Sequence, residues 1–332
     1  MSVKLKPLDD QIMVITGASS GIGLATAKEA ARQGARLVLA SRNEEALKQI
    51  VTDIENEGGQ ATYQVADVGK KEDLEKVATK AKETYGGFDT WVNNAGVSIY
   101  GRLTDVSDED SRRLFDTNFW GVVNGSLTAA EHLRNRGGAI INIGSVLSDV
   151  SIPIQGMYSA SKHAVKGFTN ALRVELEDEE APISVTLIKP SAINTPYPSH
   201  AKNYTSQEVT LPPPIYAPEE VANAILHAAE HPQRDIIIGG GGRMMNVTQK
   251  IAPGLMDWIN EKFMISQQFK DRPASQKEGS LHKHGKDGKI HGDHEGHVMK
   301  TSLYTRAAMH PVLTSAAAVA AAGAIALLSN RK

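Results

Sequence analysis

The sequence predicts an α/β protein built on a doubly wound parallel sheet of about seven strands, with helices on both faces and a C-terminal extension. Short, continuously apolar segments alternate with amphipathic segments of helical period from about residue 10 to residue 240. Glycines also cluster where the first apolar segment meets the first amphipathic one. Strands that are apolar on both faces are typical of a parallel sheet that helices cover on both sides.

Strands and helices alternate through the first part of the chain. The segments expected to form strands are, in order, QIMVIT, ARLVLA, ATYQV, TWVNN, GAIINIG, ISVTLI and DIIIG. Helices are expected where apolar residues recur at helical spacing, at Ile22–Gln33, Glu44–Glu57, Lys71–Tyr85 and Ser111–Arg136. A further helix is expected over MYSASKHAVKGFTNALRVELED. We therefore assign residues 1–240 to one α/β domain.

The chain changes character after the glycines at 239–242. Residues 241–268 have the pattern of a helical extension. Residues 269–308 are rich in His, Lys and Gly and contain no expected strand, which indicates a disordered linker. Residues 309–332 form an alanine-rich apolar stretch that we expect to be a helix.

The C-terminal extension leaves two questions open. Residues 311–328 are about long enough to cross a bilayer, but their alanine content makes insertion marginal. A membrane anchor and a helix that packs on a partner subunit are both consistent with that stretch. Five of the eleven histidines lie between His282 and His297. We expect a solvated linker there and no metal site, because the spacing does not pair ligands on a recognisable scaffold.

Composition narrows the class of protein. The formal net charge of -2 does not favour a nucleic-acid partner. The chain has no cysteine, so disulfides and thiol chemistry are excluded. The N-terminal MSVKLKPLDD lacks the apolar core of a secretory signal. We expect a cytoplasmic protein, with membrane association through residues 311–328 left open.

A glycine-rich turn follows the first expected strand and opens the first expected helix. Gly17, Gly21 and Gly23 form a G-x-x-x-G-x-G pattern. Glycine allows a tight turn and a close approach of backbone to a pyrophosphate, and the helix N-terminus favours an anion. The turn therefore predicts a dinucleotide site, with Ser19, Ser20 and Ile22 in the same loop.

The end of the second expected strand bears on which dinucleotide binds. An acidic residue there would bond the ribose hydroxyls and favour NAD, but this chain has Ser41 and Arg42. A guanidinium beside a small hydroxyl suits a 2′-phosphate. We predict NADP(H) as the cofactor; the alternative is an arginine that is merely solvated.

Tyr158 and Lys162 are the candidate proton-transfer residues. They lie at i and i+4 of an expected helix and so share a face. An ammonium near the phenol oxygen favours the phenolate and is expected to lower the tyrosine pKa. Ser145 follows the strand GAIINIG, and its hydroxyl is suited to bond a substrate oxygen.

Ordered motifs between residues 8 and 240 give the chain a family resemblance. They are TGASSGIG at 16–23, ADV at 66–68, NNAG at 93–96, Asn118, Ser145 and YSASK at 158–162. The chain thereby resembles the short-chain dehydrogenase/reductase family, whose Rossmann-type domain binds the dinucleotide and carries the catalytic residues. The resemblance implies that Asn118, Ser145, Tyr158 and Lys162 are catalytic.

The resemblance also assigns cofactor contacts. It implies that Asp67 and Val68 lie by the adenine, that Asn94, Ala95 and Gly96 pack along the cofactor, and that Tyr158 and Lys162 lie at its nicotinamide end. It places Pro190, Ile193 and Thr195 at the nicotinamide amide and a water beside Asn118 and Lys162. The chain departs from the family at Ser191, where glycine is usual.

The expected activity is an NADP(H)-dependent interconversion of a carbonyl and an alcohol, with Tyr158 as general acid and base. Alternatives are a nonenzymatic NADP(H)-binding sensor or scaffold and a sugar epimerase or dehydratase on the same fold. Partners are expected to be a small-molecule substrate and a second copy of the chain. Substrate contacts are expected from residues 97–103, 146–157 and 192–218, including Ile152, Ile154, Met157, Tyr197, His200 and Lys202.

Overall fold

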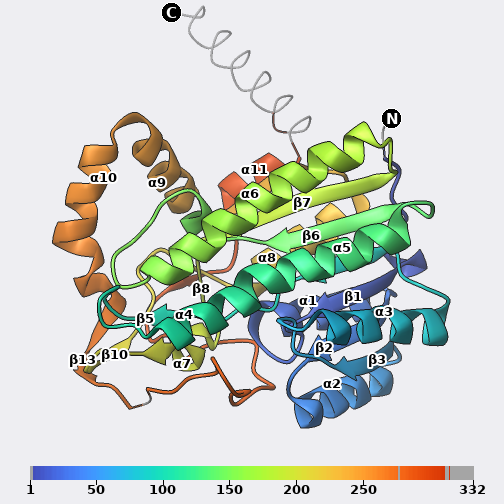
Figure 1. The fold of residues 1–332 in the computed structure, drawn as a ribbon, viewed down its shortest axis with the longest axis horizontal. Helices are drawn as coiled ribbons and strands as arrows, with labels where there is room; N and C mark the ends of the chain where they lie inside the picture. The colour runs from blue at the N-terminus through green and yellow to red at the C-terminus, as the bar shows by residue number, and fades with distance from the viewer. Residues whose placement is uncertain (1–2, 276, 311–313, 315–332) are drawn as a thin grey trace, which may run out of the picture.

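The central element of the protein is a seven-stranded, wholly parallel sheet with the strand order β12-β7-β6-β4-β1-β2-β3 (Figure 1). The structure is a computed structural model that describes residues 3–275, 277–310 and 314. The strands are β1 (Ile12–Thr16), β2 (Arg36–Ser41), β3 (Gln60–Val65), β4 (Thr90–Asn93), β6 (Gly138–Ile143), β7 (Ile183–Pro190) and β12 (Asp235–Ile238). The predicted doubly wound fold and each predicted strand are confirmed.

Helices cover both faces of the sheet. They are α1 (Gly21–Arg32), α2 (Glu44–Asn56), α3 (Lys71–Tyr85), α4 (Asp108–Phe115), α5 (Gly121–Leu133), α6 (Gly156–Asp178) and α8 (Pro218–Glu230). One buried cluster joins α1, α2 and α8 to the sheet, and a second joins α3, α5 and α6 to it. Strand β1 contributes Met13 and Ile15 to the first and Ile12 and Val14 to the second, because successive side chains point to opposite faces.

The helix predicted over Ser111–Arg136 is not continuous. A π-helical segment, η2 (Asp116–Trp120), separates α4 from α5. A π-helical turn is a local distortion of the i→i−4 pattern that hydrophobic periodicity does not reveal. It carries Asn118, so the distortion sets where that side chain points.

The predicted helical extension is also broken. It forms α9 (Gly240–Ile251), α10 (Pro253–Ile259), the π-helical η4 (Asn260–Met264) and the 3₁₀-helical η5 (Ser266–Gln268). The break falls at Ala252, because Pro253 has no N–H to continue the first helix and fits the first turn of the next.

The prediction that residues 269–308 contain no strand is wrong. Strand β13 (Phe269–Pro273) pairs antiparallel with β10 (Gln207–Val209), and β14 (Val298–Met299) pairs with β11 (Ile215–Tyr216). Helix α11 (Leu303–Met309) follows. Strand β13 has no apolar alternation to reveal it. Ion pairs from Arg272 and Lys270 to Glu208 hold it instead, and they lower the pKa of that carboxyl to about 2.

Short elements beyond the main sheet complete the fold. They are the 3₁₀ helices η1 (Leu8–Asp10) and η3 (Val146–Ser148), the helix α7 (Tyr197–His200), and the strands β5 (Ile99–Tyr100), β8 (Ala192–Ile193) and β9 (Lys202–Asn203). Within the described residues, no helix is long and apolar enough to span a bilayer. The stretch 311–328, for which an anchor and a packing helix stay open, lies outside the described residues apart from Thr314.

Candidate active site

A cavity of about 470 Å³ lies at the carboxyl ends of β1, β2, β4, β6 and β7, where ligands of open α/β sheets bind. Nearly all the predicted site residues line it: Gly17, Ser19, Ser20, Gly21, Ile22, Ser41, Arg42, Asp67, Val68, Asn94, Ala95, Gly96, Ser145, Tyr158, Lys162, Pro190, Ile193 and Thr195. Gly23 and Asn118 are not part of the lining: Gly23 packs against the Gly17 carbonyl, and Asn118 is fully buried beside Gly96. Residues far apart in the sequence are therefore brought to one site.

The glycine-rich turn leaves no room for side chains. Gly17 and Gly21 have φ of 64° and 53°, in the left-handed region that favours glycine. A Cβ on Gly23 would lie 2.2 Å from the carbonyl oxygen of Gly17. The Asn94 amide ties the turn to β4 through hydrogen bonds to the carbonyls of Thr16 (2.9 Å) and Gly17 (3.2 Å). This backbone cradle at the N-terminus of α1 fits the pyrophosphate of a dinucleotide.

Arg42 does not project freely into solvent at the end of β2. Its guanidinium donates to the carbonyls of Leu281 (3.1 Å), Ser280 and Lys283 (3.3 Å) in the C-terminal extension. Burial lowers the pKa of Arg42, and the nearby positive charge of Arg113 adds to that effect. The alternative of a merely solvated arginine therefore does not describe this side chain.

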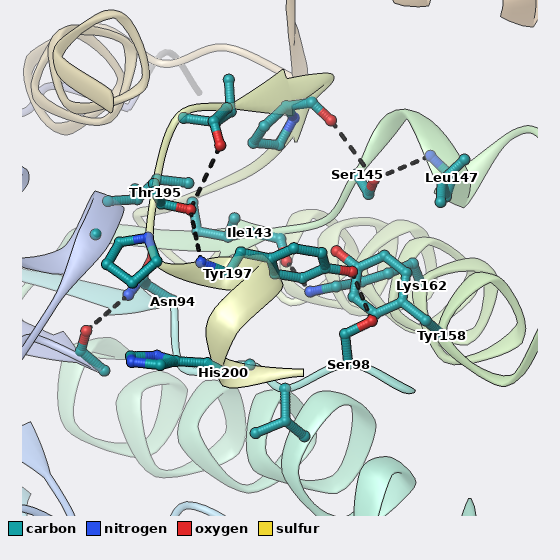
Figure 2. A pocket seen from close by; sticks show the side chains of 18 of the residues that line it. Asn94, Ser98, Ile143, Ser145, Leu147, Tyr158, Lys162, Thr195, Tyr197 and His200 are labelled. Atoms are coloured by element: carbon teal, nitrogen blue, oxygen red, sulfur yellow. Dashed lines mark hydrogen bonds between the residues drawn. The ribbon is translucent and has the colours of Figure 1, made fainter. Parts of the chain in front are cut away.

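Tyr158 and Lys162 project from α6 into the cavity (Figure 2). The Lys162 side chain is buried; its Nζ donates to the carbonyl of Ile143 (2.8 Å) and lies 5.7 Å from the centre of the Tyr158 ring. Burial lowers the pKa of Lys162 to about 8. The structure therefore confirms the shared helical face that the i, i+4 spacing predicts.

The expected lowering of the Tyr158 pKa is not found in this structure. Burial raises the pKa of Tyr158 to about 12, and the hydroxyls of Ser145 and Tyr197 oppose that rise only in part. The lysine ammonium does not offset the loss of solvent; its Nζ bonds the Ile143 carbonyl and lies 5.7 Å from the centre of the Tyr158 ring.

Asn118 is fully buried and its amide is held by the protein. Its Oδ1 accepts from the N–H of Val97 (2.8 Å), and its Nδ2 donates to the Val97 carbonyl (2.9 Å) and to Ser161 Oγ (3.2 Å). These bonds join η2, the segment after β4 and helix α6. Asn118 therefore fixes the helix that carries Tyr158 and Lys162.

Ser145 and Ser191 lie at the ends of neighbouring strands. Ser145 Oγ accepts from the N–H of Leu147 (3.0 Å) and faces the Pro190 carbonyl at 3.5 Å. Ser191 replaces the glycine that the family usually has, and its Oγ donates to the Ile238 carbonyl (2.7 Å). Its φ is not positive, since Ile154 and Glu180 are the non-glycine residues with positive φ in the described part of the chain. The backbone at Ser191 thus does not need glycine.

Tyr197 has a larger part in the site than the sequence indicates. Its ring packs edge-on against Tyr158, with the ring centres 5.6 Å apart. Its hydroxyl donates to Gln155 Oε1 (2.9 Å) and lies 2.7 Å from Ser98 Oγ (Figure 2). The sequence suggested Tyr197 only as an apolar wall, and it did not single out Ser98 or Gln155. No local pattern could reveal them, because the contacts join separate loops.

The other residues expected to meet substrate divide into two groups. Ile152, Tyr197 and His200 line the cavity. Ile154, Met157 and Lys202 are not part of the lining: Ile154 packs in a separate apolar cluster, and Lys202 forms ion pairs with Glu278 and Asp110. Within the described part of the chain, no cluster of three or more His, Asp or Glu side chains is arranged to hold a metal ion.

Sequence and structure comparisons agree with this geometry. Residues 11–205, more than half of the chain, match the family model for short chain dehydrogenases. The fold, the glycine-rich turn and the family match together define the class of this protein, a dinucleotide-binding oxidoreductase. The chain belongs to the short-chain dehydrogenase/reductase family.

Several relatives are similar over most of their length. An uncharacterized oxidoreductase, YxnA, of Bacillus subtilis is 47% identical, with 95% of this chain and 89% of the relative covered. The 11-beta-hydroxysteroid dehydrogenase A of Sesamum indicum is 34% identical, with 75% of this chain and 74% of that protein covered.

Two solved structures have the same fold. An alcohol dehydrogenase of Thermococcus sibiricus, complexed with 5-hydroxy-NADP, has a TM-score of 0.61 and 27% identity over 69% of this chain and 95% of its own. A short chain dehydrogenase/reductase of Burkholderia phymatum, in complex with NAD, has a TM-score of 0.64 and 25% identity over 81% of this chain and 99% of its own.

The close contact at Gly23 gives a test of the cradle. We expect Gly23→Ala to weaken dinucleotide binding at least about tenfold, because the new Cβ would force the Gly17 carbonyl out of place. Gly167→Ala in α6 is the matched control, since a Cβ there meets nothing within 4 Å. Isothermal titration with NADP⁺ and NAD⁺ measures both. Equal binding by the two variants would contradict the assigned cradle.

Proposed function

We propose that the protein is an NADP(H)-dependent oxidoreductase that interconverts a carbonyl and an alcohol, with Tyr158 as general acid and base. The observation that carries the proposal is the placement of Tyr158 and Lys162 in the same cavity as the glycine-rich turn. A dinucleotide seated on the turn and extended along Asn94, Ala95 and Gly96 would bring its nicotinamide end toward that pair.

The dinucleotide supplies the hydride chemistry, and the chain's own residues handle the proton. During reduction, the Tyr158 hydroxyl donates its proton to the substrate oxygen as negative charge develops there. The Ser145 hydroxyl lowers the pKa of the phenol through a hydrogen bond, and we assign it a hydrogen bond to the same substrate oxygen. Lys162 places a positive charge near the ring, which favours the phenolate left behind.

The cavity favours an apolar substrate. Its lining from three segments of the chain, those after β6, after β10 and in the C-terminal helices, is apolar: Val146, Leu147, Ile152, Leu211, Pro212, Pro213, Pro214, Met244, Met245 and Met264. Burial of each methylene group against such a surface contributes about 0.8 kcal/mol to binding. We therefore assign an uncharged, largely apolar ketone, aldehyde or alcohol to this part of the cavity.

Removal of the Tyr158 hydroxyl tests the catalytic assignment. We expect Tyr158→Phe to lower kcat for the reduction of apolar aldehydes and ketones by about 10³-fold, because the proton donor is lost. NADPH binding should change less than about threefold, since the ring remains. Tyr63→Phe, on β3 and away from the cavity, is the control. Near-full turnover in Tyr158→Phe would refute the assignment, whereas loss of binding alone would reassign Tyr158 to cofactor contact.

Arg42 tests the cofactor preference. A charge-assisted hydrogen bond to a 2′-phosphate contributes about 1.5–3 kcal/mol, so Arg42→Ala should lower kcat/KM for NADP(H) by about 10- to 100-fold. The value for NAD(H) should change little. Arg32→Ala, an exposed arginine of α1 paired with Glu29, is the control. An unchanged ratio of the two cofactors in Arg42→Ala would exclude this role.

The pKa values predict different pH profiles for the two directions of the reaction. Reduction needs protonated Tyr158, and a pKa of about 12 keeps it protonated, so kcat/KM for reduction should be flat from about pH 6 to 8. Oxidation needs the phenolate, so kcat/KM should rise up to about tenfold per pH unit over that range. Above pH 8 the rise should flatten, because Lys162 loses its charge near its pKa of about 8. Initial rates in both directions measure this, and a flat oxidation profile would speak against Tyr158 as the base.

A further inference from the structure

Residues 277–292 of the C-terminal extension, which we name the strap, run along the adenosine end of the dinucleotide cavity. The strap contributes Ser280, His284, Gly285 and Asp287 to the cavity lining, beside the glycine-rich turn and Arg42. In Figure 1 it is the orange-red coil that returns from β13 past the carboxyl ends of the central strands. It bounds the cavity on a side that the parallel sheet does not reach.

The strap holds Arg42 through main-chain atoms. The carbonyls of Ser280, Leu281 and Lys283 accept from its guanidinium. The Leu281 carbonyl also accepts from Arg113 Nε (3.2 Å), and the fully buried Leu281 side chain packs in an apolar cluster with Val97, Ile99 and Leu114. The side chain that we assign to the 2′-phosphate is thus positioned by the extension.

The strap also pairs with the glycine-rich turn. The N–H of Gly288 donates to the carbonyl of Ser19 (2.8 Å), and the N–H of Gly21 donates to the carbonyl of Lys289 (2.9 Å). Gly288 has φ of 86°, in the left-handed region. Asp287 accepts from the side chain of Asn43 (2.9 Å), just after β2. These three hydrogen bonds join the strap to the glycine-rich turn and to Asn43 after β2, on both sides of the cofactor's expected adenosine end.

The ends of the strap are attached to the loop after β7. The N–H of Ser280 donates to the carbonyl of His200 (2.7 Å), and His200 Nε2 meets the carbonyl of Lys286 (3.0 Å). At the far end, the N–H of Gly292 donates to the carbonyl of Asn194 (3.2 Å). A segment held at so many points is part of the domain's architecture and not a free linker.

We propose that the strap is a wall of the cofactor site: it positions Arg42, closes over the adenosine end of bound NADP(H), and must open for the cofactor to exchange. The inference rests on the proposed NADP(H) function. The strap and the glycine-rich turn both line the cavity, and the space between them is open. The strap therefore lies beside the expected cofactor position. Except at Leu281, the contacts named above are polar bonds, and such a segment can open locally without global unfolding.

Proteolysis of the unmodified full-length chain gives the first test. Lys283, Lys286 and Lys289 are exposed on the strap and are sites for trypsin. A saturating concentration of NADPH should slow cleavage after these lysines at least about tenfold, because the cofactor stabilises the closed strap. Cleavage after basic residues outside the strap is the internal control. Unchanged cleavage, or faster cleavage with NADPH, would overturn the proposal.

A substitution in the strap gives the second test. Gly288→Pro removes the N–H that bonds the Ser19 carbonyl, and proline cannot adopt the positive φ of this position. The strap should therefore no longer be held against the glycine-rich turn. We expect NADPH to dissociate at least about tenfold faster, measured by stopped-flow fluorescence during a chase with NADP⁺. Gly254→Ala is the matched control in α10, where a Cβ meets nothing within 4 Å.

The outcomes separate the two levels of the proposal. If the wild-type chain binds NADPH and Gly288→Pro does not change the rate of NADPH dissociation, the strap proposal is refuted and the cofactor assignment stands. Tighter NADPH binding by Gly288→Pro would make the strap a competitor of the cofactor and would also refute it. Absence of NADPH binding by the wild-type chain would refute the cofactor assignment, and the strap proposal with it. Thermal unfolding of each variant checks that the domain is intact.

Discussion

The close packing of backbone at the first turn is the constraint on which the site depends. Gly23 lies so near the Gly17 carbonyl that any side chain would separate α1 from β1. The Asn94 amide then joins the same turn to β4. Because the turn is held on both sides, the N-terminus of α1 and the ends of β1, β2 and β4 face one cavity. Tyr158 and Lys162 on α6, the proposed catalytic pair, line the same cavity as this cradle.

Burial controls the chemistry of that pair. Taking Tyr158 and Lys162 out of water favours the neutral form of each, so the tyrosine pKa rises and the lysine pKa falls. A neutral phenol suits proton donation, and a lysine with a pKa of about 8 can change charge near neutral pH. Ser145 and Tyr197 act in the opposite sense, so residues from two other segments of the chain adjust the pKa of the phenol.

The C-terminal extension changes the boundary of the functional unit. The parallel sheet and its helices supply the cradle, but Arg42 donates hydrogen bonds to carbonyls that follow it by more than two hundred positions in the chain. Ion pairs between Glu208 and β13 attach the start of that extension to the loop after β7. The match to the Bacillus subtilis relative covers 95% of this chain, and so it reaches beyond the α/β domain into the extension.

Much of the fold and of the site could be predicted, because the signals are local. Apolar strands, the G-x-x-x-G-x-G turn and the i, i+4 spacing of Tyr158 and Lys162 each depend on neighbouring residues. The break in the helix around Asn118 could not be predicted, because a π-turn leaves the periodicity of the sequence nearly unchanged. Strand β13 was missed because ion pairs stabilise it, and these have no period.

The sequence by itself determined the sheet, the family and the set of residues that converge at the strand ends, since backbone sterics and hydrophobic period act over short distances. Only the tertiary structure decided the environment of those residues. It buried Lys162, partly buried Tyr158, brought Tyr197 against the phenol, and placed the strap against Arg42. Such effects depend on which distant segments exclude water from a given atom. The spacing of residues along the chain does not reveal which segments these are.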